Sequence, residues 1–344
     1  MNADYWLPII FISLMGLAVL IYAILDGYDL GVGILLPHHS ETQKDRMIAS
    51  IGPFWDANET WLVLAVGLLL IAFPSAHNIV LRELYLPATV MLCGLILRGV
   101  AFDFRAKVGT SYRKKLWDKI FTFGSLTTAL SQGYMLGFYV VGFEYTALNI
   151  SFAIISALCV TAAYTYIGGS WLIMKTEGVL QYAATRWTRR AGWLMALGII
   201  AVSLVNLWTS PYILHKWVNT LSGVLLWIVP VICLLLFWLN DRVLRAMKNQ
   251  QQQYLDHGTA LNDHLCWLPF CNTAIIFVLC FIGLGFSFYP FIIPQQLDIW
   301  QAASASTSLQ FLLWGAIVVI PIILLYTIFS YRVFWGKAKA LDYY

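Results

Sequence analysis

The sequence predicts an all-α polytopic membrane protein with nine transmembrane helices. The 344 residues are 60% hydrophobic and 11% charged, whereas about 25% of a soluble globular chain is charged. Apolar runs long enough to cross a bilayer recur along the whole chain. Lys and Arg gather in alternate connections between these runs. The net charge of +4 is small and confined to those connections, so nucleic-acid binding is not indicated.

Nine apolar runs are the predicted spans, because most approach the ~20 residues that cross the hydrocarbon core. The second and sixth are shorter. We expect residues 1–344 to form one integral membrane domain, with 240–268 as its longest cytoplasmic loop. No cleavable signal peptide is expected, since Asp4 precedes the first run and no basic segment does. The spans are placed near Trp6–Leu25, Thr60–Phe73, Ile79–Ala101, Ile120–Val141, Ile150–Met174, Trp193–Trp208, Leu221–Leu239, Thr273–Ile293 and Leu309–Tyr331.

The basic residues orient the chain. They are frequent after the first, third, fifth and seventh spans and in the C-terminal tail, and sparse in the other connections. Because cytoplasmic loops carry the excess of Lys and Arg, we expect the N-terminus outside and the C-terminus in the cytoplasm. That result requires an odd number of spans, which nine satisfies. The basic residues include Lys44, Arg46, Arg105, Lys107, Arg113, Lys114, Lys115, Arg186, Arg189, Arg190, Arg242, Arg245 and Lys248.

Five carboxylates meet the membrane at one level, on the predicted cytoplasmic side. Asp26 and Asp29 end the first span, and Asp56 and Glu59 begin the second. Asp103 ends the third span, where Arg98 lies about one turn deeper. Members of each pair are three residues apart, so each pair shares a helical face. Glu59, the second acid of the second span, is expected to lie deepest in the membrane. In chain order these residues are Asp26, Asp29, Asp56, Glu59, Arg98 and Asp103.

Two interpretations of this acidic cluster are open. Acids at such a depth usually point into a bundle or a hydrated cavity. Partial burial can tune them to bind and release protons, as a proton-entry path requires. Alternatively, they mark the helix ends at the interface and form ion pairs with Arg98, Arg105 and Lys107.

Histidine is absent from the predicted spans, although the chain has six. Haem in a helical membrane protein is normally held by an axial His or Met that projects into the bundle. Methionine inside spans mostly fills gaps in packing. The sequence therefore predicts neither a haem ligand nor a metal site in this chain.

Several glycines are spaced as in close helix–helix contacts. Gly27 and Gly31 are four residues apart in the acidic segment. Gly168 with Gly169, and Gly283 with Gly285, indicate further helix pairs packed at small separation.

Specific segments resemble subunit II of the cytochrome bd-type quinol oxidases. They are DGYDLGVG (Asp26–Gly33), FWDANETW (Phe54–Trp61), LRGVAFDFR (Leu97–Arg105), SFYPFIIP around Phe288–Pro294, and PIILLYT (Pro321–Thr327). The resemblance follows nearly the whole chain in order. It implies two four-helix bundles plus a peripheral helix, in a bacterial inner membrane. It also implies a partner, subunit I, that holds haems b and d and oxidises quinol on the outer side, in a complex that reduces dioxygen to water with cytoplasmic protons.

The resemblance also gives roles to residues. In the family a proton route follows the subunit interface past carboxylates that match Asp26 and Asp56, with Asp103 a weaker candidate. Some members have Gln at the position of Glu59, so the resemblance does not require an acid there. Some members bind a structural quinone in subunit II, but nothing in this sequence identifies its pocket. A small accessory subunit and membrane lipid are further expected partners.

A proton-coupled secondary transporter is the alternative, since it would also contain intramembrane acids. Transporters usually have internal repeats with helices broken at mid-membrane. Here the acids lie at one edge instead. We therefore favour an oxidase subunit that is not catalytic by itself.

Overall fold

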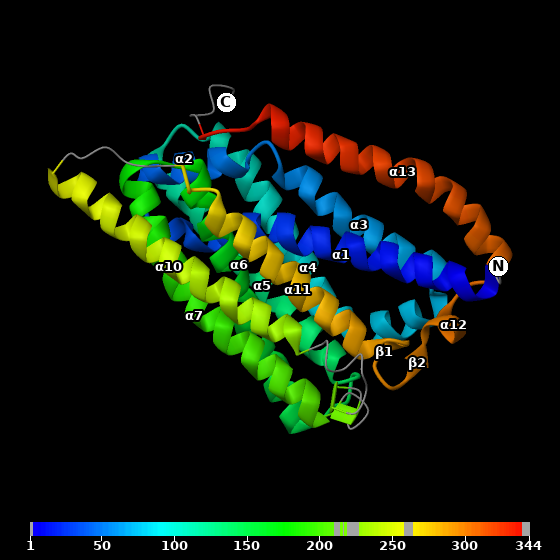
Figure 1. The fold of residues 1–344 in the computed structure, drawn as a ribbon. Coiled ribbons are helices and arrows are strands. Elements are labelled where there is room, and N and C mark those ends of the chain that lie inside the picture. Colours follow the sequence, from blue (N-terminus) through cyan, green and yellow to red (C-terminus); the bar gives the residue numbers. More distant parts are fainter. Residues whose placement is uncertain (1–2, 210–213, 216, 219–226, 258–263, 339–344) are drawn as a thin grey trace.

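The computed structural model describes residues 3–209, 214–215, 217–218, 227–257 and 264–338, which form a bundle of long, roughly aligned helices (Figure 1). The long helices are α1 (Ala3–Leu35), α3 (Trp55–Ala72), α4 (Pro74–Lys107), α5 (Ser111–Val140), α6 (Ala147–Lys175), α7 (Gly178–Thr209), α10 (Ile228–His257), α11 (Leu268–Phe288) and α13 (Ser306–Val333). The short elements are η1 (Leu36–His38), α2 (Glu41–Ile51), α12 (Ile299–Ala302), β1 (Phe291–Ile293) and β2 (Leu297–Asp298).

The all-α prediction is confirmed. Within the described residues, seven helices are long and apolar enough to cross a membrane: α1, α3, α4, α6, α7, α11 and α13. The other two long helices, α5 and α10, also overlap expected spans. They are more polar, because α5 is rich in Gly, Ser and Thr and α10 is polar beyond Leu239.

The predicted loop at 240–268 is wrong over most of its length. Helix α10 continues to His257, and α11 begins at Leu268. Residues 242–257 contain neither Gly nor Pro and are mostly good helix formers, so the helix outlasts its apolar part. Residues 258–263 lie outside the described part of the chain, as do 221–226 of the seventh predicted span.

Helix α1 lies at the centre, in contact with α3, α5, α6 and α11. Its tightest contact is with α6, where a Cβ on Gly31 would lie 1.8 Å from the Tyr164 carbonyl oxygen. A Cβ on Gly168 would lie 2.6 Å from the Gly31 carbonyl carbon. Gly31 and Gly168 therefore lie at a close helix contact, as expected of both glycine pairs, although the sequence did not show that the two pairs meet each other.

The glycines of α11 do not form such a contact. Among the described residues, a Cβ on Gly283 would meet only Val229 Cγ1, at 3.5 Å, and one on Gly285 would meet nothing within 4 Å. The expected close helix pair at these positions is therefore wrong.

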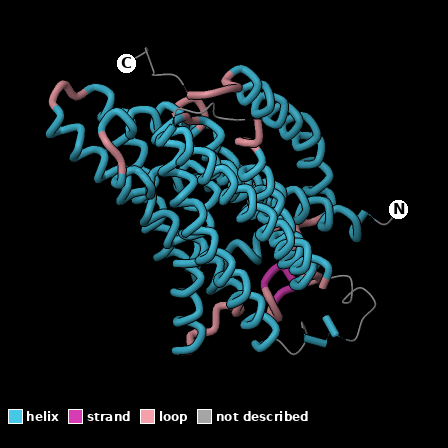
Figure 2. The backbone as a smooth tube through the Cα atoms, turned by 60° about the vertical axis from the view of Figure 1, so that its left-hand side comes forward, coloured by secondary structure: helices cyan, strands magenta, loops and turns pink. Residues whose placement is uncertain are grey.

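The two-stranded hairpin lies at one end of the bundle (Figure 2), and Figure 1 shows it beside α12 near the start of α13. The Tyr139 hydroxyl of α5 donates to the Ile292 carbonyl at 2.7 Å, which fixes the hairpin to the bundle. Helix α13 is peripheral (Figure 1). Only Leu309 and Ile320 of α13 are buried, so most of its surface faces outward.

Candidate functional site

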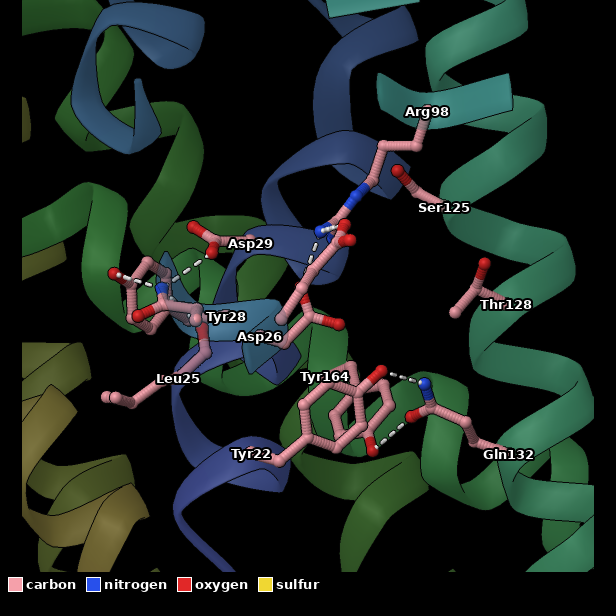
Figure 3. A network of polar contacts seen from close by, with 12 residues as sticks. Tyr22, Leu25, Asp26, Tyr28, Asp29, Arg98, Ser125, Thr128, Gln132 and Tyr164 are labelled. Atoms are coloured by element: carbon pink, nitrogen blue, oxygen red, sulfur yellow. Dashed lines mark hydrogen bonds and ion pairs between the residues drawn. The ribbon is translucent and has the colours of Figure 1, made fainter. Parts of the chain in front are cut away.

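The acidic cluster forms where α1, α3 and α4 meet (Figure 3). Helix α1 does not end at the predicted position, Leu25, but continues to Leu35. Asp26 and Asp29 therefore lie inside this helix, and both are 0% exposed. Helix α3 begins at Trp55, which places Glu59 near its first turn.

One guanidinium joins two of the acids. Arg98 Nη2 lies 2.6 Å from Asp26 Oδ1 and 2.5 Å from Glu59 Oε1. The Arg98 side chain is 1% exposed and that of Glu59 is 26% exposed. Glu59 thus reaches the surface of this chain, while Asp26 lies fully inside it. A buried charge has lost its contact with water, so it needs a direct contact with the opposite charge. Removing one partner would leave the other charge uncompensated.

Asp29 belongs to a neighbouring hydrogen-bond network. Asn58 Nδ2 donates to Asp29 Oδ2 at 2.8 Å and to the Tyr28 hydroxyl at 3.1 Å. The Tyr331 hydroxyl lies 2.5 Å from the Tyr28 hydroxyl and donates to Asn58 Oδ1 at 3.3 Å. These contacts tie the end of α13 to α1 and α3.

Some polar atoms of the cluster are left over. Within the described residues, Asp26 Oδ2, Asp29 Oδ1, and Arg98 Nε and Nη1 are buried and have no hydrogen-bond partner. Buried polar groups without partners are uncommon and often belong to functional sites. The two carboxylate oxygens are positions at which a proton could bind.

A pair of tyrosines continues the polar region towards α5 and α6 (Figure 3). Gln132 Nε2 donates to the Tyr22 hydroxyl at 2.6 Å, and the Tyr164 hydroxyl donates to Gln132 Oε1 at 2.7 Å. All three side chains line a cavity of about 920 Å³ whose other walls are mostly apolar, with Gly67 and Trp217 among them. The cavity lies among α1, α3, α4, α5, α6, α7, α10 and α11.

The remaining predicted site residues lie at the surface. Asp56 and Asp103 are exposed, and neither has an ion pair among the described residues. Arg105 contacts Asp45 and Asp118 and does not join the acidic cluster, so that part of the interfacial-pair interpretation is wrong. The structure thus brings together Asp26, Glu59 and Arg98, places Asp29 in the neighbouring buried network, and leaves Asp56 and Asp103 on the outside.

A second charged network, between α2, α4 and α5, was not predicted from the sequence. Arg105 Nε lies 2.5 Å from Asp118 Oδ1, and Lys44 Nζ lies 3.3 Å from Asp118 Oδ2. Asp45 contacts Arg105 at 2.8 Å and Lys114 at 2.9 Å. Burial raises the pKa of Asp45, but the hydrogen bonds from Lys114 and Arg105 outweigh it and hold that pKa below its usual value.

The signal for this network was available in the sequence. The residues Ser40 and Gln43 form a capping box that starts α2. A short capped helix with charges on one face, following the first span, predicts an interfacial helix that needs charged partners. The partners could not be assigned, because they depend on how α4 and α5 pack.

The comparisons with known proteins decide the family. The family model for cytochrome bd terminal oxidase subunit II matches residues 7–334. The chain belongs to this family. Cytochrome bd-I ubiquinol oxidase subunit 2 of Escherichia coli K12 is 26% identical over 96% of this chain and 94% of its own length. Cytochrome bd ubiquinol oxidase subunit 2 of Bacillus subtilis is 28% identical over 68% of this chain and 70% of its own length.

A solved structure supports the same fold. The chain superimposes on a chain of the bd oxidase from Geobacillus thermodenitrificans with a TM-score of 0.76 and 19% identity, covering 96% of this chain and 98% of that one. This likeness supports the fold, and the family model confirms the expected family.

This subunit II belongs to a bd-type quinol oxidase, an oxidoreductase complex of the respiratory chain, and is a multi-pass protein of the bacterial inner membrane. The complex of this family contains haem, as its name states. Family membership supports the oxidase over the secondary transporter.

Proposed function

We propose that this chain supports a haem-bearing subunit I and delivers protons to it from the cytoplasm. The observation that carries the proposal is the Arg98 cluster, in which partly exposed Glu59 and fully buried Asp26 contact the same guanidinium. Asp56 and Asp103, exposed on α3 and α4, would collect protons at its entrance. Intramembrane acids of this kind commonly serve proton relays.

The arrangement suits stepwise proton transfer. When Glu59 binds a proton, its attraction to Arg98 weakens and the pair between Arg98 and Asp26 becomes the stronger one. Transfer of the proton to Asp26 reverses this balance, and Asp26 Oδ2 is available to accept it. Arg98 thus keeps the number of unpaired charges low at each step, which limits the cost of burial.

The proposal includes the arrangement of the whole chain. Each of the nine long helices would cross the membrane once. Two four-helix bundles would be formed by α1, α3, α4, α5, α6, α7, α10 and α11. Helix α13 would be the peripheral ninth helix. The N-terminus would lie outside and the C-terminus in the cytoplasm, following the basic connections. Haems b and d and the quinol-oxidising loop would belong to subunit I, and a small accessory subunit would join the pair.

Replacing Asp56 by Asn is expected to slow oxygen reduction by about tenfold, because a positioned proton-transfer group is lost. The haem absorption spectrum of the purified complex should remain nearly unchanged. The measurement is oxygen consumption with excess quinol, and Glu144→Gln, at another exposed acid, is the control. A rate for Asp56→Asn equal to that of the control would refute the role of Asp56.

We also propose that the apolar cavity holds a structural quinone. Its volume of about 920 Å³ and its mainly apolar walls fit an isoprenoid chain, and the hydroxyls of Tyr22 and Tyr164 offer polar contacts for a ring. Gly67 lines the cavity, and a Cβ there would meet nothing within 4 Å.

Replacing Gly67 by Phe is therefore expected to fill part of the cavity without displacing the helix. Solvent extraction of the purified complex should then yield about one quinone fewer than from the unmodified complex. Gly285→Phe is the matched control, since Gly285 is equally uncrowded but does not line the cavity. An unchanged quinone content in Gly67→Phe would contradict the proposed pocket.

A further inference from the structure

A basic surface lies where the apolar parts of α7 and α10 end, on the edge of the bundle opposite α13 (Figure 1). It consists of Arg186, Arg189, Arg190, Arg242, Arg245 and Lys248, with Asp241 as the one acid within 186–190 and 241–248. Six cations against one carboxylate leave an excess of five positive charges, more than the +4 of the whole chain. The proposed proton route does not use any of these residues.

The basic surface adjoins the apolar part of both helices. Arg189 Nε contacts Asp241 Oδ1 at 2.7 Å, which sets the two helices in register. From that ion pair, apolar residues run down α7 after Arg190 and down α10 before Asn240. The exposed indole of Trp193 on α7 packs against Phe237 of α10, with ring centroids 5.4 Å apart. Tryptophan at this level is typical of the lipid–water interface.

Two guanidinium groups are held at this boundary by tryptophans. Arg190 lies 5.3 Å from the ring centroid of Trp187, and Arg242 lies 4.6 Å from that of Trp238. Cation–π contacts leave the N–H groups at the edge of a guanidinium free to bind an anion. Arg245 is occupied differently, since its Nη2 contacts Asp241 Oδ2 at 2.5 Å.

The surface next to these cations is apolar and exposed. Leu194 and Leu197 of α7 are 59% and 63% exposed, and Leu234 and Leu235 of α10 are 55% and 53% exposed. An anion that binds the arginines alone would leave this apolar surface uncovered. A molecule with an anionic head and hydrocarbon tails covers both.

We propose that the α7–α10 basic surface binds an anionic phospholipid, whose phosphodiester contacts Arg190 and Arg242 and whose acyl chains lie along the exposed leucines. Charge complementarity selects an anionic headgroup over a zwitterionic one, because attraction to lipid headgroups grows with each basic residue near the membrane surface. The adjoining apolar surface selects a lipid over a soluble phosphate.

The test is lipid binding to the purified, delipidated two-subunit complex, measured by native mass spectrometry. Dioleoyl-phosphatidylglycerol is the probe, and dioleoyl-phosphatidylcholine and inorganic phosphate are the comparison ligands. We expect the double variant Arg190→Gln/Arg242→Gln to lower the affinity for phosphatidylglycerol about tenfold or more. Arg113→Gln/Lys115→Gln is the matched control, because it removes two exposed charges from the start of α5.

The result that supports the proposal is a loss confined to the α7–α10 variant, with weaker binding of phosphatidylcholine. Equal losses in both variants would mean that only overall charge matters and would overturn it. Binding of phosphate as tight as that of phosphatidylglycerol would also overturn it. If the double variant does not assemble, the single variants Arg190→Gln and Arg242→Gln test the same contacts, and full retention of lipid by both would overturn the proposal.

Discussion

Replacing Arg98 by Met is expected to destabilise the protein by about 3–5 kcal/mol, the usual cost of breaking a buried ion pair by removing one partner. Arg98 is 1% exposed and contacts Asp26 and Glu59 at 2.6 Å and 2.5 Å. Met preserves much of the side-chain volume, so the loss reports on charge and hydrogen bonding. Thermal unfolding of the purified complex, and the amount of assembled complex in membranes, measure it.

A matched control is available in the same helix. Arg82 is 75% exposed and pairs with its neighbour Glu83 at 2.8 Å. Arg82→Met should change stability by less than about 1 kcal/mol, as exposed pairs usually do. Adding Asp26→Asn to Arg98→Met should restore part of the loss, because the remaining buried group is then neutral. Equal stabilities of Arg98→Met and Arg82→Met would show that Arg98 does not hold the cluster together.

Replacing Gly31 by Ala is expected to destabilise the packing of α1 on α6 by about 3 kcal/mol or more, at the upper end of overpacking effects. The new methyl group would lie 1.8 Å from the Tyr164 carbonyl oxygen, which is backbone and cannot rotate away. The helices must separate, and that displaces Asp26 and Asp29 on the same segment. The yield of assembled complex and its unfolding temperature are the measurements.

Gly67→Ala is the control for this effect. Gly67 lies in α3, where an added Cβ meets nothing within 4 Å, so the same chemical change should be tolerated. Since Ala favours helix more than Gly, the control variant is expected to be slightly stabilised. Assembly of Gly31→Ala at the level of Gly67→Ala would contradict the close crossing of α1 and α6.

The sequence predicted the fold well where composition alone decides it. Each expected apolar run overlaps a long helix, because burial in lipid requires continuous helices. Helix ends were predicted less well, since the polar residues that end an apolar run do not end a helix. Helix α1 continues for 10 residues beyond the predicted end at Leu25, to Leu35. Helix α10 continues through Asn240, where the loop was predicted to begin, to His257.

The candidate site could be predicted only in part. The spacing of Asp26 and Asp29 at the end of the first span, and the position of Arg98 near the end of the third, placed these groups at one level. Burial could not be ranked from the chain: Glu59, expected to be deepest, is 26% exposed, while Asp26 is fully enclosed. The ranking depends on the crossing of α1 with α6, which carries Asp26 into the bundle. The network of Asp118 depends likewise on tertiary packing.

The central claim is that Asp26 passes protons from the cytoplasm towards the redox centre in the partner subunit. The most direct test is time-resolved proton uptake by the reduced complex in liposomes after mixing with oxygen, comparing Asp26→Asn with the unmodified protein. Proton uptake by Asp26→Asn is expected to be slower by about tenfold or more, with the haem spectrum retained. Uptake at the unmodified rate, in a complex that is fully assembled, would contradict it.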